Sequence, residues 1–206
     1  MQVAAWLIAI AGSYLLGSVS FAVVVSRLFG LADPRSYGSG NPGATNVLRS
    51  GSRAAAALTL FGDAAKGALA VALVRGFAPP FGVGELGVAL AALAAFVGHL
   101  YPLFFRFQGG KGVATFLGAL LAFSPSAGLA ACVAWLAVAL LFRFSSLASL
   151  SAAVVAPIAL IWATQETNLC VVVAVMSLLL IVRHRRNIGN LLAGRERRIG
   201  EKARPG

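Results

Sequence analysis

The sequence predicts an all-α integral membrane protein, a bundle of about seven transmembrane helices forming a single polytopic membrane domain over residues 1–206. The first observation is composition: 59% of the residues are hydrophobic, 11% are charged and the mean hydropathy is +0.88, which is too apolar for an ordinary soluble domain. The second is charge placement. The basic residues fall between long apolar stretches and at the C-terminus, so the net charge of +11 indicates membrane topology and does not indicate nucleic-acid binding.

Seven apolar stretches resemble membrane-spanning helices, which need about 20 residues each. We place them at about residues 3–26, 54–77, 84–104, 112–124, 127–143, 146–164 and 168–183, followed by a basic tail over 184–206. The fourth stretch is short, and the sequence leaves open whether it crosses the membrane completely. Only Ser124-Pro-Ser-Ala separates it from the fifth stretch. A six-helix bundle is the main alternative.

The basic residues support an odd number of spans. When seven spans place alternate loops on opposite sides, one face holds fifteen of the 17 Lys and Arg residues and the other holds Arg75 alone, with Lys66 inside the second span. Basic loops of membrane proteins face the cytoplasm. We therefore expect the N-terminus outside, the C-terminus in the cytoplasm and the chemistry on the cytoplasmic side.

The first polar loop, Tyr37 to Arg49, has the composition of an anion-binding segment. Three glycines lie among hydroxyl and amide side chains, so successive backbone N–H groups can converge on an anion, and Arg49 adds a forked positive charge suited to phosphate. An ordinary turn-rich connection has similar residues. The functional interpretation is favoured because helix connections usually need only about 2–8 residues, and this polar stretch runs from Arg27 to Arg53.

The second loop places Gly109, Gly110 and Gly112 around Lys111, immediately before an apolar helix. Free N–H groups at a helix N-terminus and a nearby ammonium form a phosphate site. The loop is not a Walker P-loop, because Gly112 follows the lysine where Ser or Thr is required. The alternative for Lys111 is an interfacial lysine that extends to the membrane surface. His99, before this loop, is expected to be structural.

The third segment, Arg183 to Glu196, begins at the inner end of the last span. His184 and Asn187 are three residues apart, hence on one helical face, and could together bind a polar substrate. An anionic-lipid anchor is the interpretation we prefer for the basic residues of the tail, which are Arg195, Arg197, Arg198, Lys202 and Arg204.

Other polar residues lie within or beside the spans. Asp63 and Lys66, at i and i+3, are expected to form a pair that holds the bundle together beneath the site. Ser146 and Ser149 have two equally weighted interpretations, lining the pocket or bonding back to their own helix. The two cysteines lie far apart in apolar stretches, and no cluster with metal-ligand spacing appears in the sequence.

Three segments together resemble the signature segments of the bacterial acyl-phosphate:glycerol-3-phosphate acyltransferases, the PlsY family. They are Ser39-Gly-Asn-Pro-Gly-Ala-Thr-Asn-Val-Leu-Arg49, Gly109-Gly-Lys-Gly-Val-Ala-Thr115 and Arg183-His-Arg-Arg-Asn-Ile188. The resemblance covers nearly the whole chain in length, helix number and motif order. It implies an enzyme of the bacterial inner membrane that moves a fatty acyl group from acyl phosphate to the 1-hydroxyl of glycerol 3-phosphate, giving lysophosphatidic acid and phosphate in an early step of phospholipid synthesis.

The resemblance also implies roles for single residues. The catalytic set would be Ser39, Arg49, Lys111, His184 and Asn187. Substrate-binding residues would be Gly40, Asn41, Thr45, Asn46, Gly109, Gly110, Gly112, Ser146 and Ser149. Acyl phosphate is already activated, so no cofactor and no metal are demanded. Partners would be the two substrates and membrane lipids, with the enzyme that makes acyl phosphate as a further contact and no nucleic acid.

The sequence departs from the family pattern at two positions, and it leaves open the proton acceptor and an alternative function. Ser20 stands where proline is common, and Asn190 where a basic residue is often found. Neither histidine is followed five residues later by Asp, so the His-x4-Asp motif of other acyltransferases is missing, and either His184 or the donor phosphate must take the proton. A small transporter of a phosphorylated anion is the alternative function, although no internal repeat is visible.

Overall fold

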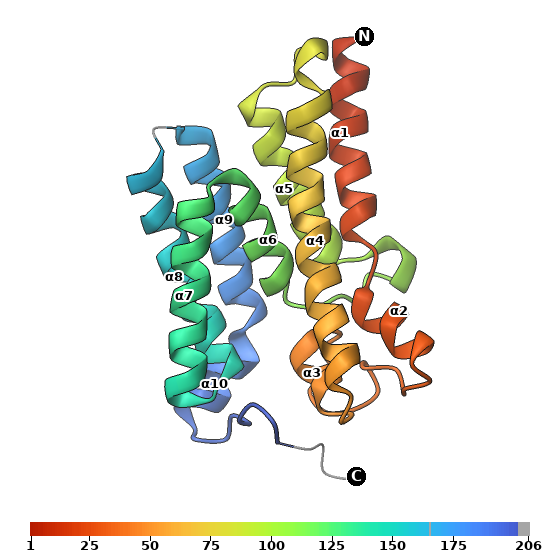
Figure 1. Ribbon diagram of the computed structural model, residues 1–206, viewed down its shortest axis with the longest axis vertical. Coiled ribbons are helices and arrows are strands. Elements are labelled where there is room, and N and C mark those ends of the chain that lie inside the picture. The colour runs from red at the N-terminus through yellow and green to blue at the C-terminus, as the bar shows by residue number, and fades with distance from the viewer. Residues whose placement is uncertain (165, 202–206) are drawn as a thin grey trace.

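The computed structural model describes residues 1–164 and 166–201, and these residues form ten α-helices and two 3-10 helices (Figure 1). Lys202 and Arg204 of the predicted lipid anchor lie outside the described residues. In chain order the elements are α1 (Gln2–Gly17), α2 (Phe21–Leu28), α3 (Ala44–Leu48), α4 (Arg53–Phe77), η1 (Pro79–Phe81), α5 (Glu85–Leu100), η2 (Leu103–Phe105), α6 (Val113–Phe123), α7 (Pro125–Phe142), α8 (Ser145–Ala163), α9 (Thr167–Arg183) and α10 (Arg185–Leu192).

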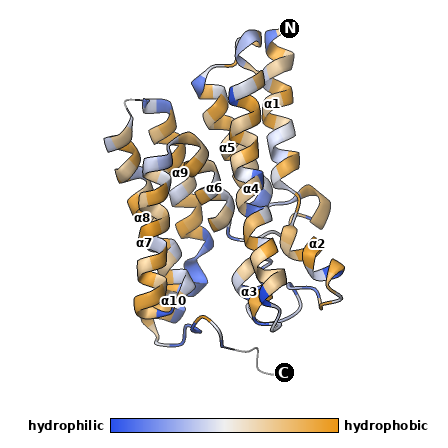
Figure 2. Cartoon of the chain, viewed as in Figure 1, coloured by the Kyte–Doolittle hydropathy of each residue, from blue (hydrophilic) through white to orange (hydrophobic). Residues whose placement is uncertain are grey.

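The helices are apolar enough for a membrane protein. Four stretches, α4, Glu85–Phe105, α7 and α8, are long and apolar enough to cross a bilayer, and six are if the bent pairs α1–α2 and α9–α10 each count as one span. Their outer surfaces carry exposed large apolar side chains such as Leu141 (76% exposed) and Trp162 (87%), and hydrophobic residues cover most of the helices in Figure 2. Such a surface suits lipid as the surrounding solvent.

The first predicted span is broken, so the expectation of one helix over 3–26 is wrong. α1 ends at Gly17, α2 begins at Phe21, and the two helices meet at an angle of 44°. Two side chains satisfy the backbone at the break: the Ser18 hydroxyl donates to Tyr14 O at 2.9 Å, and Lys66 Nζ of α4 donates to Val19 O at 2.7 Å. An interrupted helix is tolerated at this depth because its free carbonyl has a partner.

α6 is short and central. Its 11 residues rise only about 16 Å, roughly half of the hydrocarbon layer. As predicted, it is separated from α7 at Ser124, whose hydroxyl accepts from Ala127 N and caps α7. α6 packs against both α4 and α7, and Phe116 on it contacts Phe96 of α5 in the buried core with ring centroids 6.3 Å apart. In Figure 1 α6 lies between α1, α4 and α5 on one side and α7, α8 and α9 on the other.

The last predicted span also differs from expectation at its end. α9 stops at Arg183, the chain bends by 57°, and α10 follows. His184 therefore lies at the bend. We had expected it to share a regular helix with Asn187 because of their spacing, and this expectation is wrong. The start of α1 and α10 lie at opposite ends of the molecule (Figure 1).

Candidate active site

Two adjoining cavities are lined by residues of α3, the start of α6 and α10. α3 and α10 lie at the same end of the molecule (Figure 1). The inner cavity has a volume of about 370 Å³ and the outer one about 630 Å³. Both are lined by the same six residues at their junction: Ser39, Asn41, Arg49, Lys111, Asn187 and Glu196.

The two cavities differ in chemistry. Apolar side chains of three helices line the inner cavity, namely Leu60 of α4, Leu117 and Leu121 of α6, and Cys132 and Trp135 of α7. The outer cavity is lined by many cations, namely Arg49, Lys111, Arg183, Arg185, Arg186, Arg195 and Arg197. An anionic group in the outer cavity could therefore belong to the same molecule as an apolar chain in the inner one.

Lys111 stands at the junction in a chain of short hydrogen bonds. Its Nζ donates to Asn187 Oδ1 at 2.6 Å, and Asn187 Nδ2 donates to Glu196 Oε1 at 2.6 Å. The Ser146 hydroxyl of α8 donates to the same carboxylate oxygen at 2.7 Å. Burial lowers the pKa of Lys111 to about 8, with Glu196 opposing the shift and the neighbouring Arg49 and Arg183 adding to it. The ammonium is thus still predominantly charged at pH 7.

The start of α6 aims backbone donors into the inner cavity. Gly112 precedes the helix with φ of +82°, and a Cβ there would collide with the Phe96 ring, so no other residue fits without strain. Val113 and Ala114 of the first turn line the cavity, and their N–H groups lack partners within the helix. Beside Lys111, this helix N-terminus is suited to an anion.

Asn46 organises the first polar loop. Its Nδ2 donates to Pro34 O at 2.6 Å and to Tyr37 O at 3.1 Å. Its Oδ1 accepts from Ser39 N at 3.0 Å and from an Arg49 guanidinium nitrogen at 3.3 Å. The Asn46 amide therefore holds Ser39 and Arg49 toward the junction. Burial, followed by the charge of Arg197, lowers the pKa of Arg49 from its usual value, and the guanidinium stays charged at neutral pH.

His184 is oriented by its own helix. Its Nδ1 lies 2.8 Å from Leu180 O, a carbonyl that can only accept, so Nδ1 carries the proton and Nε2 keeps a lone pair. Burial and then the positive charge of Lys111 lower the pKa of His184 to about 4. The ring is therefore neutral at pH 7 and lies in the wall of the inner cavity.

Comparison with known proteins agrees with this arrangement. Residues 7–194 match the sequence profile of a family described as glycerol-3-phosphate acyltransferase. The chain belongs to the glycerol-3-phosphate acyltransferase family. A protein of that name from Ralstonia nicotianae is 62% identical over 193 residues, 94% of this chain and 93% of the relative, and one from Burkholderia pseudomallei is 62% identical over 203 residues, 97% and 98% of the two chains.

Two solved structures are also similar. The crystal structure of PlsY (YgiH), an integral membrane glycerol 3-phosphate acyltransferase, in its glycerol 3-phosphate form has a TM-score of 0.88 and 41% identity, covering 95% of this chain and 96% of the other. The lysophosphatidic acid form has a TM-score of 0.85 and 40% identity, covering 94% of each chain. The resemblance to the PlsY family that the sequence suggested is thereby confirmed.

In this member of the acyltransferase family, the five residues predicted as catalytic converge. Ser39, Arg49, Lys111 and Asn187 lie at the junction of the two cavities, and His184 lies in the inner wall. Of the predicted substrate-binding residues, all but Gly110 line one or both cavities: Gly40, Asn41, Thr45, Asn46, Gly109, Gly112, Ser146 and Ser149. Gly110 is buried behind the Lys111 turn.

Ser149 satisfies both interpretations that the sequence left open. Its hydroxyl donates to Ser145 O of its own helix at 2.7 Å, and it also lines the inner cavity, where it accepts from Trp135 Nε1 at 3.2 Å. Ser146 points to Glu196 instead. The two serines therefore support different parts of the wall.

The sequence interpretation missed two residues of the site. Glu196 accepts from Asn187 and Ser146 at the centre of the junction, although we gave it no role in the tail. The signal was one of only two acidic residues, Glu196 and Glu201, in the basic segment that follows His184. Trp135 of the inner wall had no comparable signal, because an aromatic residue in an apolar helix is typical of packing.

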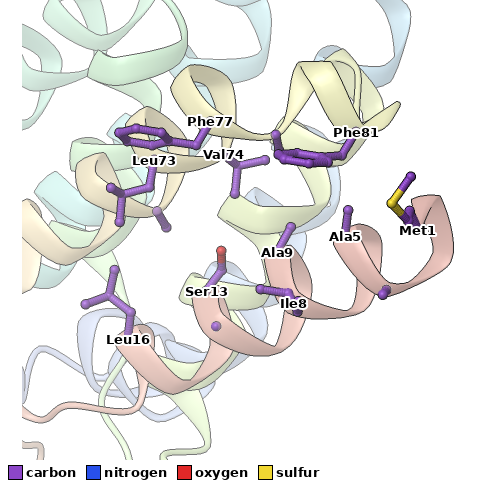
Figure 3. Close-up of a pocket in the computed structure, with 14 residues that line it drawn as sticks. Met1, Ala5, Ile8, Ala9, Ser13, Leu16, Leu73, Val74, Phe77 and Phe81 are labelled. Carbon is purple, nitrogen blue, oxygen red and sulfur yellow. The ribbon is translucent and has the colours of Figure 1, made fainter.

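A third cavity lies away from these residues. Its volume is about 670 Å³, and α1 residues such as Ile8 and Leu16 face Leu73, Phe77 and Phe81 across it (Figure 3). The side chains in Figure 3 are almost entirely carbon, apart from the Ser13 hydroxyl and the Met1 sulfur. The lining offers no group for phosphate chemistry, so size does not identify the active site here.

Proposed function

We infer that this protein transfers a fatty acyl group from acyl phosphate to the 1-hydroxyl of glycerol 3-phosphate, releasing lysophosphatidic acid and inorganic phosphate. The observation that carries this inference is the junction at Lys111, where a cation-lined cavity meets an apolar one. A fatty acyl phosphate has both characters in one molecule. The relatives at 62% identity are named for the same acceptor.

The residues at the junction have separate tasks in this reaction. Arg49, Lys111 and the N–H groups at the start of α6 bind phosphate oxygens and stabilise the charge that grows as the anhydride is attacked. Ser39 orients the donor. His184 and Asn187 hold glycerol 3-phosphate so that its hydroxyl lies against the acyl carbon, because positioning supplies much of the rate.

The proton of the attacking hydroxyl goes to the donor phosphate in this proposal. The hydroxyl oxygen bonds to the acyl carbon, the bond from that carbon to the phosphate oxygen breaks, and the departing phosphate accepts the proton. His184 was the other candidate. Its pKa of about 4 makes it a weaker base than a phosphate group, whose second pKa is about 6, so His184 serves as a hydrogen-bond partner.

We also propose the membrane in which the protein lies and the side on which its site opens. The charge distribution supports seven crossings of the bacterial inner membrane, with the N-terminus outside and the junction on the cytoplasmic side. Acyl phosphate and glycerol 3-phosphate arrive from that side, the acyl chain lies among the apolar helices, and surrounding membrane lipids contact the basic end. We further propose that the protein contacts the enzyme that makes acyl phosphate.

A direct assay tests the reaction. Purified protein in detergent, given acyl phosphate and glycerol 3-phosphate, is expected to release phosphate and lysophosphatidic acid in equal amounts. Lys111→Ala should abolish turnover while the unfolding temperature stays near that of the wild type. Absence of product from the wild type, together with phosphate-ester flux in liposomes, would favour the transporter alternative, which the similarity to glycerol-3-phosphate acyltransferases does not favour.

A further inference from the structure

A buried polar cluster lies beside the turn that carries Lys111, and two of its members, Asp63 and His99, also line the inner cavity. It consists of Asp63 and Lys66 on α4, His99 near the end of α5, and Thr115 on α6, with exposures of 2%, 1%, 7% and 0%. Asp63 Oδ1 lies 2.8 Å from Lys66 Nζ and 3.5 Å from His99 Nδ1. Ionisable groups at this depth cost free energy, so a cluster of three indicates a purpose. None of the four residues takes part in the reaction proposed above.

Hydrogen bonding determines which nitrogen of His99 carries the proton. The Thr115 hydroxyl donates its single proton to Asp63 O at 2.8 Å, so it can only accept from His99 Nδ1, 3.3 Å away. The Asp63 carboxylate also favours a proton on that nitrogen. The Nδ1 edge of the ring is therefore fixed by α4 and α6, and the Nε2 edge points the other way.

His99 supports the turn before Lys111 through two separate contacts. Its backbone carbonyl accepts from Gly110 N at 3.1 Å, and the Nε2 edge of its ring packs against Gly110, where an added Cβ would collide with Nε2. From the other side, Arg183 of α9 donates to Gly109 O at 3.1 Å and to Gly110 O at 2.9 Å. The turn is thus held between His99 and Arg183, and Lys111 is the next residue.

The cluster also reaches the broken first span, because Lys66 Nζ binds both Asp63 and Val19 O. One continuous set of polar contacts therefore runs from the α1–α2 break through α4 and α5 to the glycine turn. Rigid second-layer contacts of this kind set the accuracy of a catalytic side chain.

We propose that His99 is a positioning residue: held by Thr115 and Asp63, its ring fixes the Gly109–Gly112 turn and so aims Lys111 at the substrate phosphate. This inference rests on the proposed acyltransferase function and adds to it a residue that acts through Lys111. It gives a specific task to the structural role that we expected for His99.

Three substitutions at His99 test the proposal by turnover in the acyl-phosphate assay. Asn places an amide N–H where Nδ1 was, Gln places one where Nε2 was, and Ala provides neither. We expect His99→Ala and His99→Gln to lower kcat about a hundredfold, since misplacing a catalytic group by about 1 Å has an effect of that size, and His99→Asn to recover at least about tenfold of the loss. Unfolding temperatures should be similar in all three.

The matched control is Thr59→Ala, one turn before Asp63 on α4. Thr59 is fully buried, and the described part of the chain offers its hydroxyl no hydrogen-bond partner, so turnover should stay at the wild-type level. Thr115→Val provides a second arm: it removes the hydroxyl that accepts from His99 Nδ1 and donates to Asp63 O, and it should lower kcat. This arm carries the test if the His99 variants do not fold.

Several outcomes overturn the proposal. Recovery by Gln in place of Asn would mean that Nε2 contacts the substrate directly. Wild-type kcat in His99→Ala, or in Thr115→Val when His99 variants are unfolded, would show that the turn needs no support from the ring. A wild-type protein that forms no product would instead contradict the proposed acyltransferase function, so the two failures are distinguishable.

Discussion

At the scale of single residues, the site depends on shared contacts more than on any one charge. Lys111 is bound to Asn187, and Asn187 to Glu196, in bonds of 2.6 Å. Short bonds to charged groups are among the stronger hydrogen bonds in proteins. The residues proposed as catalytic are therefore held in place before any substrate enters.

Lys111 gives the site an expected pH dependence. Its pKa of about 8 means that the ammonium is present below pH 8 and is lost as the pH rises through that value. We predict that kcat/KM falls on the alkaline side with an apparent pKa near 8, since this ratio reports ionisations of the free enzyme. In Lys111→Arg this alkaline decline should disappear whatever activity remains, because a guanidinium stays charged. An unchanged alkaline limb in that variant would assign the ionisation to another group.

Glu196 is predicted to matter through the two donors that it accepts. Glu196→Ala leaves the Asn187 amide and the Ser146 hydroxyl without their acceptor, and hydrogen bonds to charged groups contribute about 1.5–3 kcal/mol, so kcat/KM should fall by about 10- to 100-fold. Glu196→Gln keeps an acceptor oxygen and should lose less. The exposed Glu201→Ala is the control. Equal activity of Glu196→Ala and Glu201→Ala would rule out this role.

At the scale of elements, the decisive features are interruptions of helices. The break between α1 and α2 frees Val19 O for Lys66, the turn before α6 presents Lys111, and the bend between α9 and α10 places His184 and Asn187 on one cavity. Helix breaks are stable in a membrane only where polar partners satisfy the backbone, which here is the task of buried side chains.

The Lys66 contacts predict a stability effect. Lys66→Met removes the partner of the buried Asp63 carboxylate and of Val19 O, and breaking a buried ion pair costs about 3–5 kcal/mol. Thermal unfolding in detergent should show a clearly lower midpoint for this variant. The double variant Asp63→Asn with Lys66→Met should recover part of the loss, because no unpaired charge remains. A midpoint for Lys66→Met equal to that of the wild type would contradict the pairing.

At the scale of the whole molecule, the site lies between two groups of helices. α6 packs against α4 on one side and α7 on the other, and the inner cavity takes wall residues from all three. α3 and α10 lie at the same end of the molecule (Figure 1). The cavity thus combines residues that are separated by most of the chain.

The proposed orientation can be tested by labelling. In a Cys132→Ala, Cys170→Ala background, two variants each add a single thiol at an exposed position. Ser50→Cys lies just before α4, and Pro80→Cys lies just after it. A membrane-impermeant thiol reagent should label Pro80→Cys in intact cells and Ser50→Cys only after the membrane is opened, because the positive-inside rule places Ser50 in the cytoplasm. The reverse pattern would overturn the orientation.

The sequence by itself determined the membrane class, the ends of α4, α7, α8 and α9 to within about two residues, and the three segments that carry Ser39, Arg49, Lys111, His184 and Asn187. Apolar length and glycine-rich loops are local properties, so they can be recognised in the amino-acid sequence. Only the tertiary structure decided that the first span breaks at Val19, that Glu196 returns to the junction and that His99 supports the Lys111 turn. The physical reason is that a helix break or a buried charge is stable only with a partner, and these partners lie on other helices.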